Sequence, residues 1–238
     1  AFAQINPFGL PAAPITTKEF RYTNPITRDS ALAMRDHFII KVDKKWYCVG
    51  TSEPVWTGPN PGVRLLVSED LIHWKQHSFI IDAKKLPPDC PYNGRFWAPE
   101  IHFIKNKYYL TVNSGKVTAE DPKGMNTHNV WLFVSDNVIG PYKLVNGPLT
   151  PQYNNDATLF EDEDGQTYLY CSGNGLFQAK IDLTTGKLTT PIQKFLDKKQ
   201  PGLYNQAIMD FGAVICKPKN PLCAECPLHD SCTALKQG

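Results

Sequence analysis

The chain has 238 residues, of which 42% are hydrophobic and 20% are charged, enough apolar sequence for one large or two small globular domains. Its formal net charge of +2 combines 25 basic with 23 acidic side chains, a balance that excludes nucleic-acid or membrane-surface binding driven by charge alone. No apolar run approaches the roughly 18 residues of a membrane span, and the 20 prolines and 16 glycines favour short strands and turns.

The chain begins with Ala1-Phe2-Ala3-Gln4, which fits the small-x-small end of a secretory signal peptide, although no basic or apolar region precedes it. An ordinary N-terminal segment is the alternative. We expect residues 1–19 to form an extension outside the folded domain.

Three segments then repeat one layout: an acidic residue, an apolar strand, a polar turn and an aromatic strand. They cover residues 36–52, 100–114 and 156–172. Aligning Tyr47, Tyr109 and Tyr168 gives spacings of 62 and 59 residues. The first hairpin turns are predicted at Asp43-Lys44, Asn106-Lys107 and Asp164-Gly165, and third strands at 63–68, 130–135 and 176–183.

Four short strands in about 60 residues are what a β-propeller blade with long loops needs. The sequence therefore predicts a mainly β fold, a partial propeller of three blades over residues 20–198. A stack of separate β-hairpins is the alternative. The innermost strands of a propeller start near its axis, so Asp36, Glu100 and Asp156 are expected to approach one central pocket. The competing interpretation is that they are ordinary turn acids that face water.

These residues resemble the family 43 glycoside hydrolases, which are five-bladed β-propellers. The motifs that carry the resemblance are Met34-Arg35-Asp36, Val67-Ser68-Glu69-Asp70-Leu71 with Trp74, Phe96-Trp97-Ala98-Pro99-Glu100, Asn155-Asp156-Ala157 and Glu161-Asp162-Glu163-Asp164-Gly165. The resemblance implies inverting hydrolysis of arabinose- or xylose-containing oligosaccharides or polysaccharides. Asp36 would be the general base, Asp156 would orient the acid and tune its pKa, and Glu100 would lie beside the pocket.

An inverting hydrolase holds its two carboxyl groups about 6.5–9.5 Å apart, so that a water fits between the base and the sugar. Phe96 and Trp97 are candidate apolar walls for a sugar ring, with buried packing between blades as the alternative. The family's general acid is a glutamate of the fourth blade, and no such motif follows Asp182, since the one later glutamate is Glu225. The resemblance thus implies an impaired enzyme, in which Glu100 is the carboxyl able to substitute, or a non-catalytic carbohydrate-binding module.

The character of the sequence changes after about Lys199. Residues 204–215 are predicted to form a helix, because apolar side chains recur on one face. Four cysteines follow with the spacing Cys-x6-Cys-x2-Cys-x5-Cys: Cys216, Cys223, Cys226 and Cys232. Four thiolates in so short a segment suit a soft metal centre, while two disulfides are the choice for a secreted chain.

Residues 201–238 resemble the iron–sulfur loop of MutY-type adenine DNA glycosylases and of endonuclease III. The resemblance implies that the four cysteines hold a [4Fe–4S] cluster, with zinc as the alternative. A fragment of an adenine DNA glycosylase is accordingly the second function hypothesis. The DNA-binding and catalytic parts of that family are not matched, and the charges of residues 201–238 sum to zero, so DNA binding by this chain alone is not expected.

The two resemblances meet near Lys199, and each is incomplete there. The sequence favours a chimera of two reading frames, with a genuine two-domain protein, residues 20–198 and 199–238, as the alternative. The propeller part suggests a periplasmic or secreted protein and the cluster part a cytoplasmic one. Three blades would leave sheet faces and edges uncovered, which favours self-association.

Overall fold

A computed structural model describes residues 33–55, 60–122, 124–150, 154–173 and 175–194, and in the tail 215–217, 221–227, 229–232 and 235–236. The expected extension over 1–19 and residues 204–214 of the expected helix lie outside these ranges.

The described residues contain three antiparallel sheets, each built from strands consecutive in the chain. The first has the order β1-β2-β3-β4, the second β5-β6-β7-β8 and the third β9-β10-β11-β12, with β13 also paired to β11. The strands of the first two sheets are β1 Met34–Val42, β2 Lys45–Ser52, β3 Gly62–Ser68, β4 Lys75–Asp82, β5 Trp97–Ile104, β6 Lys107–Ser114, β7 Asn129–Ser135 and β8 Lys143–Asn146. Those of the third are β9 Asn155–Glu161, β10 Thr167–Gly173, β11 Gly175–Asp182, β12 Lys187–Leu188 and β13 Gln193–Lys194.

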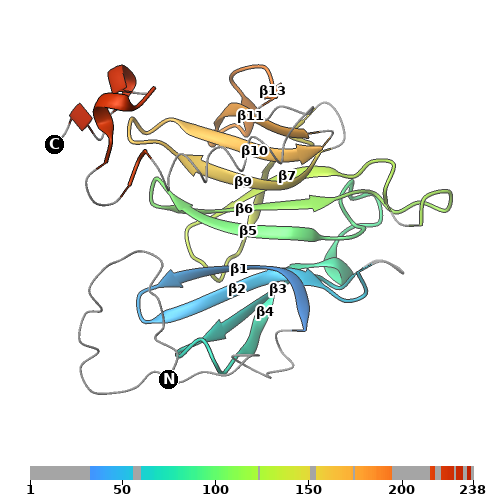
Figure 1. Cartoon of the computed structure of the whole chain (residues 1–238). Helices are drawn as coiled ribbons and strands as arrows, with labels where there is room; N and C mark the ends of the chain where they lie inside the picture. The colour runs from blue at the N-terminus through green and yellow to red at the C-terminus, as the bar shows by residue number, and fades with distance from the viewer. Residues whose placement is uncertain are drawn as a thin grey trace, which may run out of the picture.

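Three sheets of four consecutive strands are what the sequence repeat predicted, and β13 is an addition to the third. Figure 1 shows the sheets one above another, with β1 facing β5 and β5 facing β9. The first strands of the three repeats are therefore neighbours in space, as blades arranged around a shared axis require.

Buried side chains of alternate strand positions hold the sheets together. One cluster joins the first sheet to the second and contains Leu65, Phe96 and Leu110. Another joins the second sheet to the third and contains Leu132, Leu159 and Leu169. Strand residues alternate between the two sides of the middle sheet, and a neighbouring sheet covers each side, so both faces are buried.

A backbone irregularity recurs at the start of each first strand. Asp36, Ala98 and Asp156 all have positive φ, at 53°, 42° and 49°. In each case the strand register shifts there: between Arg35 and Phe38, between Trp97 and Glu100, and opposite Tyr170 and Ser172. Each repeat thus begins with a β-bulge, a device that redirects a side chain out of the regular alternation.

The bulges correct one expectation. Glu100 does not occupy the same point of its repeat as Asp36 and Asp156, because Ala98 lies there. Glu100 is two residues further along β5 and pairs with Thr111.

The tail shows two one-turn 3₁₀ helices, η3 Cys223–Glu225 and η4 His229–Ser231. In the described part of the chain, no helix has the length and apolar character needed to cross a membrane.

Candidate active site

The three acidic side chains come from three different sheets: Asp36 from β1, Glu100 from β5 and Asp156 from β9. Partial burial raises the pKa of Asp156, and the negative charges of Asp36 and Glu100 raise it further, while a hydrogen bond from Ser172 opposes the shift. Carboxylates influence one another in this way only at short range. The fold therefore brings the three predicted acidic residues into one electrostatically coupled group.

Asp36 is exposed, so water reaches its carboxylate. The hydroxyl of the fully buried Thr51 on β2 donates to Asp36 Oδ2 at 2.7 Å. The same Thr51 oxygen accepts the backbone N–H of Ala98 at 2.8 Å. A carboxylate that is exposed to water and held at one oxygen can orient a water molecule, as a general base must.

Asp156 is held at its backbone and at its side chain. Its N–H donates to Asn113 Oδ1 on β6 at 3.0 Å, and the fully buried Asn113 also donates to the carbonyl oxygen of Asn154 at 2.9 Å. Ser172 on β10 lies with its hydroxyl 3.2 Å from Asp156 Oδ2. Side chains of the preceding sheet and of its own sheet therefore fix this residue.

Glu100 is paired with a histidine. Its Oε2 lies 3.0 Å from His102 Nε2, and the side chains are 26% and 13% exposed. The His102 ring also contacts Phe38 of β1, with centroids 5.0 Å apart, and its Nε2 is 3.4 Å from the N of Leu159 on β9. His102 thus lies where the first strands of all three sheets meet.

The two aromatic residues proposed as sugar-contacting walls differ in the structure. Phe96 is 0% exposed and belongs to the core between the first two sheets, and its backbone is held by Asn60. Its assignment to substrate binding is therefore wrong, and the alternative, packing between blades, is correct. Trp97 is 8% exposed and packs against His128 and Arg95, so it offers a sugar only a small edge.

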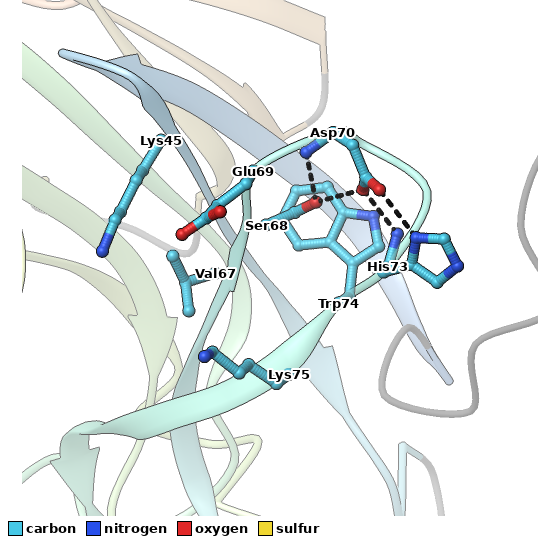
Figure 2. Close-up of a pocket in the computed structure, with 8 residues that line it drawn as sticks. All are labelled: Lys45, Val67, Ser68, Glu69, Asp70, His73, Trp74 and Lys75. Carbon is cyan, nitrogen blue, oxygen red and sulfur yellow. Dashed lines mark hydrogen bonds and ion pairs between the residues drawn. The ribbon is translucent and has the colours of Figure 1, made fainter.

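A pocket of about 320 Å³ lies elsewhere, at the β3–β4 connection (Figure 2). Its polar side chains serve the turn: Ser68 accepts two backbone N–H groups, and Asp70 accepts those of Ile72 and His73 and contacts the His73 ring. These hydrogen bonds hold the pKa of Asp70 well below its usual range. The Val67–Leu71 motif with Trp74 is therefore explained by turn formation, with no carboxylate of the acidic group involved.

The four tail cysteines line one small apolar cavity of about 30 Å³, together with Ile215, Pro221, His229 and Leu235. All are free thiols, as are the buried Cys48, Cys90 and Cys171. Within the described ranges, no three His, Cys, Asp or Glu side chains approach closely enough to form a metal-ion site. The donor type suits an iron–sulfur cluster.

Sequence reasoning missed Thr51, Asn113 and Ser172. They face the bulges in register, opposite Arg35, Trp97 and Asn155. A signal was present, since each of the three is the fourth residue after one of the aligned tyrosines. His102 was also missed, although a Glu-x-His pair on a strand places both side chains on one face.

Three sheets stacked side by side, with acidic residues on their first strands, define a mainly β protein built of blade-like sheets. Residues 22–228 match the sequence profile described as Glycosyl hydrolases family 43. The chain belongs to that family. The matched range also includes much of the cysteine-containing tail.

Individual proteins support the family and show how partial the match is. The chain is 27% identical over 197 residues to a β-xylosidase of Bacillus subtilis (strain 168), covering 76% of this chain and 31% of that protein. It resembles the solved arabinanase of Bacillus subtilis with a TM-score of 0.53 and 24% identity, covering 69% of this chain and 57% of that one. A separate match, 45% identical over 42 residues, is to human adenine DNA glycosylase and covers 18% of this chain and 8% of that protein. The chain thus spans between 8% and 57% of the length of these relatives.

Proposed function

We propose that the coupled carboxylates form the site of an inverting glycoside hydrolase for arabinose- or xylose-containing glycans. The observation that carries the proposal is that Asp36 and Glu100, from two other sheets, lie close enough to Asp156 for their charges to raise its pKa. The similarity to a β-xylosidase and to an arabinanase supports a pentose-containing substrate.

In this proposal the exposed Asp36 orients the attacking water and removes its proton. Asp156, whose pKa is raised, is the group that orients and tunes the acid. Glu100 is the nearest candidate for a proton donor to the leaving oxygen, because it lies in the same group and bonds to His102. General acid catalysis contributes about 10²- to 10⁴-fold, so we expect weak turnover of natural glycans when Glu100 does not supply it.

The test is a paired assay on an aryl pentoside with a good leaving group and on a natural oligosaccharide. We expect weak activity on the first alone, since an activated leaving group needs little protonation. Asp36→Asn should lower the rate of aryl pentoside hydrolysis at least about 10²-fold. Glu69→Gln, which lies in the distant pocket of Figure 2, is the matched control and should leave the rate unchanged.

Two outcomes would revise the proposal. Full activity in Asp36→Asn would rule out Asp36 as the general base and would contradict the proposed hydrolase site. Robust turnover of the oligosaccharide that Glu100→Gln abolishes would show that Glu100 is a competent acid and that the enzyme is not impaired.

For the tail we propose that Cys216, Cys223, Cys226 and Cys232 bind a [4Fe–4S] cluster. The support is their common cavity and the short similarity to adenine DNA glycosylase. Anaerobic purification should give a broad visible absorbance with about four iron and four sulfide per chain. Cys223→Ser should lose it and Cys90→Ser should keep it. A colourless protein with no bound iron after reconstitution would reject this proposal.

A further inference from the structure

Thr51 sits between two sheets and is bonded to both. It belongs to β2 of the first sheet and is 0% exposed. Its hydroxyl oxygen is 2.7 Å from Asp36 Oδ2 within its own sheet and 2.8 Å from the N of Ala98 in the second.

The chemistry of the two contacts fixes the direction of each hydrogen bond. Ala98 N–H can only donate, so the threonine oxygen accepts there. A threonine hydroxyl carries a single hydrogen, and the geometry leaves that hydrogen for Asp36 Oδ2. The β-branched side chain also has few rotamers, so neither contact is easily exchanged for another.

An equivalent arrangement recurs at the next boundary, which shows that it is a built feature of the repeat. Asn113 of β6 accepts the N–H of Asp156 from the third sheet. Both acceptors lie opposite a bulge, and both bind the positive-φ residue of the following repeat. Only at the first boundary does the side chain in addition donate to a carboxylate.

We propose that Thr51 is a positioning residue for the hydrolytic base: the amide of Ala98 polarises its hydroxyl, which holds Asp36 Oδ2 and directs the other carboxylate oxygen to water. This inference rests on the proposed function. It implies that the packing of the second sheet against the first helps to orient the carboxylate of Asp36. Asp156 of β9 is a charged group near enough to Asp36 for the two to interact electrostatically.

The first experiment needs no turnover. Carboxyl signals of ¹³C-labelled aspartate are recorded at neutral pH in the full chain, with Asp36 assigned through Asp36→Asn. Thr51→Val removes the hydroxyl at nearly constant volume, and the carboxyl signal of Asp36 should change position, because its Oδ2 loses a hydrogen-bond donor. Thr51→Ser should restore the original position of the signal.

Thr111→Val is the matched control. Thr111 is also 0% exposed, and its hydroxyl donates to the carbonyl oxygen of Ala157 in the next sheet at 2.7 Å, with no carboxylate involved. It should lose stability as Thr51→Val does and leave the Asp36 carboxyl signal in place. An Asp36 signal at the same position in Thr51→Val and Thr51→Ser, or an equal displacement of that signal in Thr111→Val, would overturn the inference.

The second experiment uses hydrolysis of the aryl pentoside. Thr51→Val should lower kcat about tenfold with KM unchanged, and Thr51→Ser should restore it. Absence of hydrolysis by the unsubstituted chain would count against the proposed function. The NMR comparison would still decide the role of Thr51.

If Thr51→Val does not fold, a third measurement leaves Thr51 intact. A slowly exchanging hydroxyl proton of Thr51 should be visible by NMR and should disappear in Asp36→Ala but persist in Asp156→Ala. Persistence of that proton in Asp36→Ala would contradict the hydrogen bond on which the inference depends.

Discussion

Asp156 shows how a single residue of the proposed site can be unfavourable for stability. Partial burial and two neighbouring negative charges raise its pKa. A carboxylic acid with a raised pKa in the folded state binds its proton more tightly there than in the unfolded chain. It therefore lowers stability as the pH rises from the ordinary aspartate range through the raised value.

Asp156→Asn should accordingly stabilise the protein at neutral pH and have no effect at a pH below the ordinary aspartate range. The gain should be at most about 1 kcal/mol, because the residue is exposed and solvent screens its charge. Urea denaturation at pH 3 and pH 7 measures it. Asp182→Asn is the control of opposite sign, since hydrogen bonds from Thr184 and Thr185 lower the pKa of Asp182. A gain for Asp156→Asn that is the same at both pH values would contradict the electrostatic explanation.

Among single residues, the acidic ones could be identified from sequence because the repeat marks their approximate places. The sequence did not indicate that Ala98, and not Glu100, is the residue equivalent to Asp36. A bulge changes the alternation of side chains by one residue, and composition gives no sign of it. Spacing from the aligned tyrosines would have revealed it, because Asp36 and Ala98 both precede their tyrosine by 11 residues.

At the level of elements, strand prediction succeeded where more and less buried residues alternate, as in β9. It also succeeded for β6, which is buried along six consecutive residues and was predicted from its place in the repeat. The second hairpin turn, predicted at Asn106-Lys107, lies one residue earlier in the structure. Lys105 and Asn106 carry the positive φ values, 50° and 61°, and Lys107 already belongs to β6. A polar run alone does not tell which two of its residues form the turn.

Two glycines allow the backbone and the packing contributions at turns to be separated. Both Gly62, at the start of β3, and Gly165, in the β9–β10 turn, have positive φ. A Cβ at Gly62 would overlap the carbonyl oxygen of Ile81, whereas a Cβ at Gly165 would meet nothing within 4 Å. Gly165→Ala should cost about 1 kcal/mol, from the left-handed conformation alone.

Gly62→Ala should cost about 3 kcal/mol, because it adds a clash with the backbone of β4 to the strain of a φ of 118°. The difference between the two variants, from urea midpoints at constant slope, gives the cost of the clash together with that of the larger φ. Similar losses for both would mean that β3 and β4 separate freely at this end.

On the scale of the whole molecule, the middle sheet determines cooperativity. Leu110 and Leu132 are both 0% exposed in this sheet, but one packs toward the first sheet and the other toward the third. Leu110→Ala and Leu132→Ala should each lower the free energy of unfolding by about 2–5 kcal/mol. Each should also keep a single transition, coincident by tryptophan fluorescence and circular dichroism.

Leu144→Ala, on the outer strand β8 and 43% exposed, is the control and should change stability by less than about 0.5 kcal/mol. Two separate transitions in Leu132→Ala would show that the third sheet unfolds on its own. Self-association through uncovered sheet faces stays a prediction, as does the joining of two reading frames near Lys199.

The bulge at Ala98 keeps its backbone shape without an acidic side chain, and this has a consequence for how such a protein changes over time. At this point of the repeat, the bulge in the backbone does not depend on whether its side chain is acidic. Duplication of a repeat supplies another first-strand position aimed at the centre, and one codon then decides whether that position carries charge. Aspartate tolerates the left-handed conformation better than alanine does, so Ala98→Asp would add an acidic side chain to the neutral member of the three first-strand bulges with little strain on the fold. The number of acidic groups at the centre can thus grow or shrink by single substitutions while the architecture stays constant.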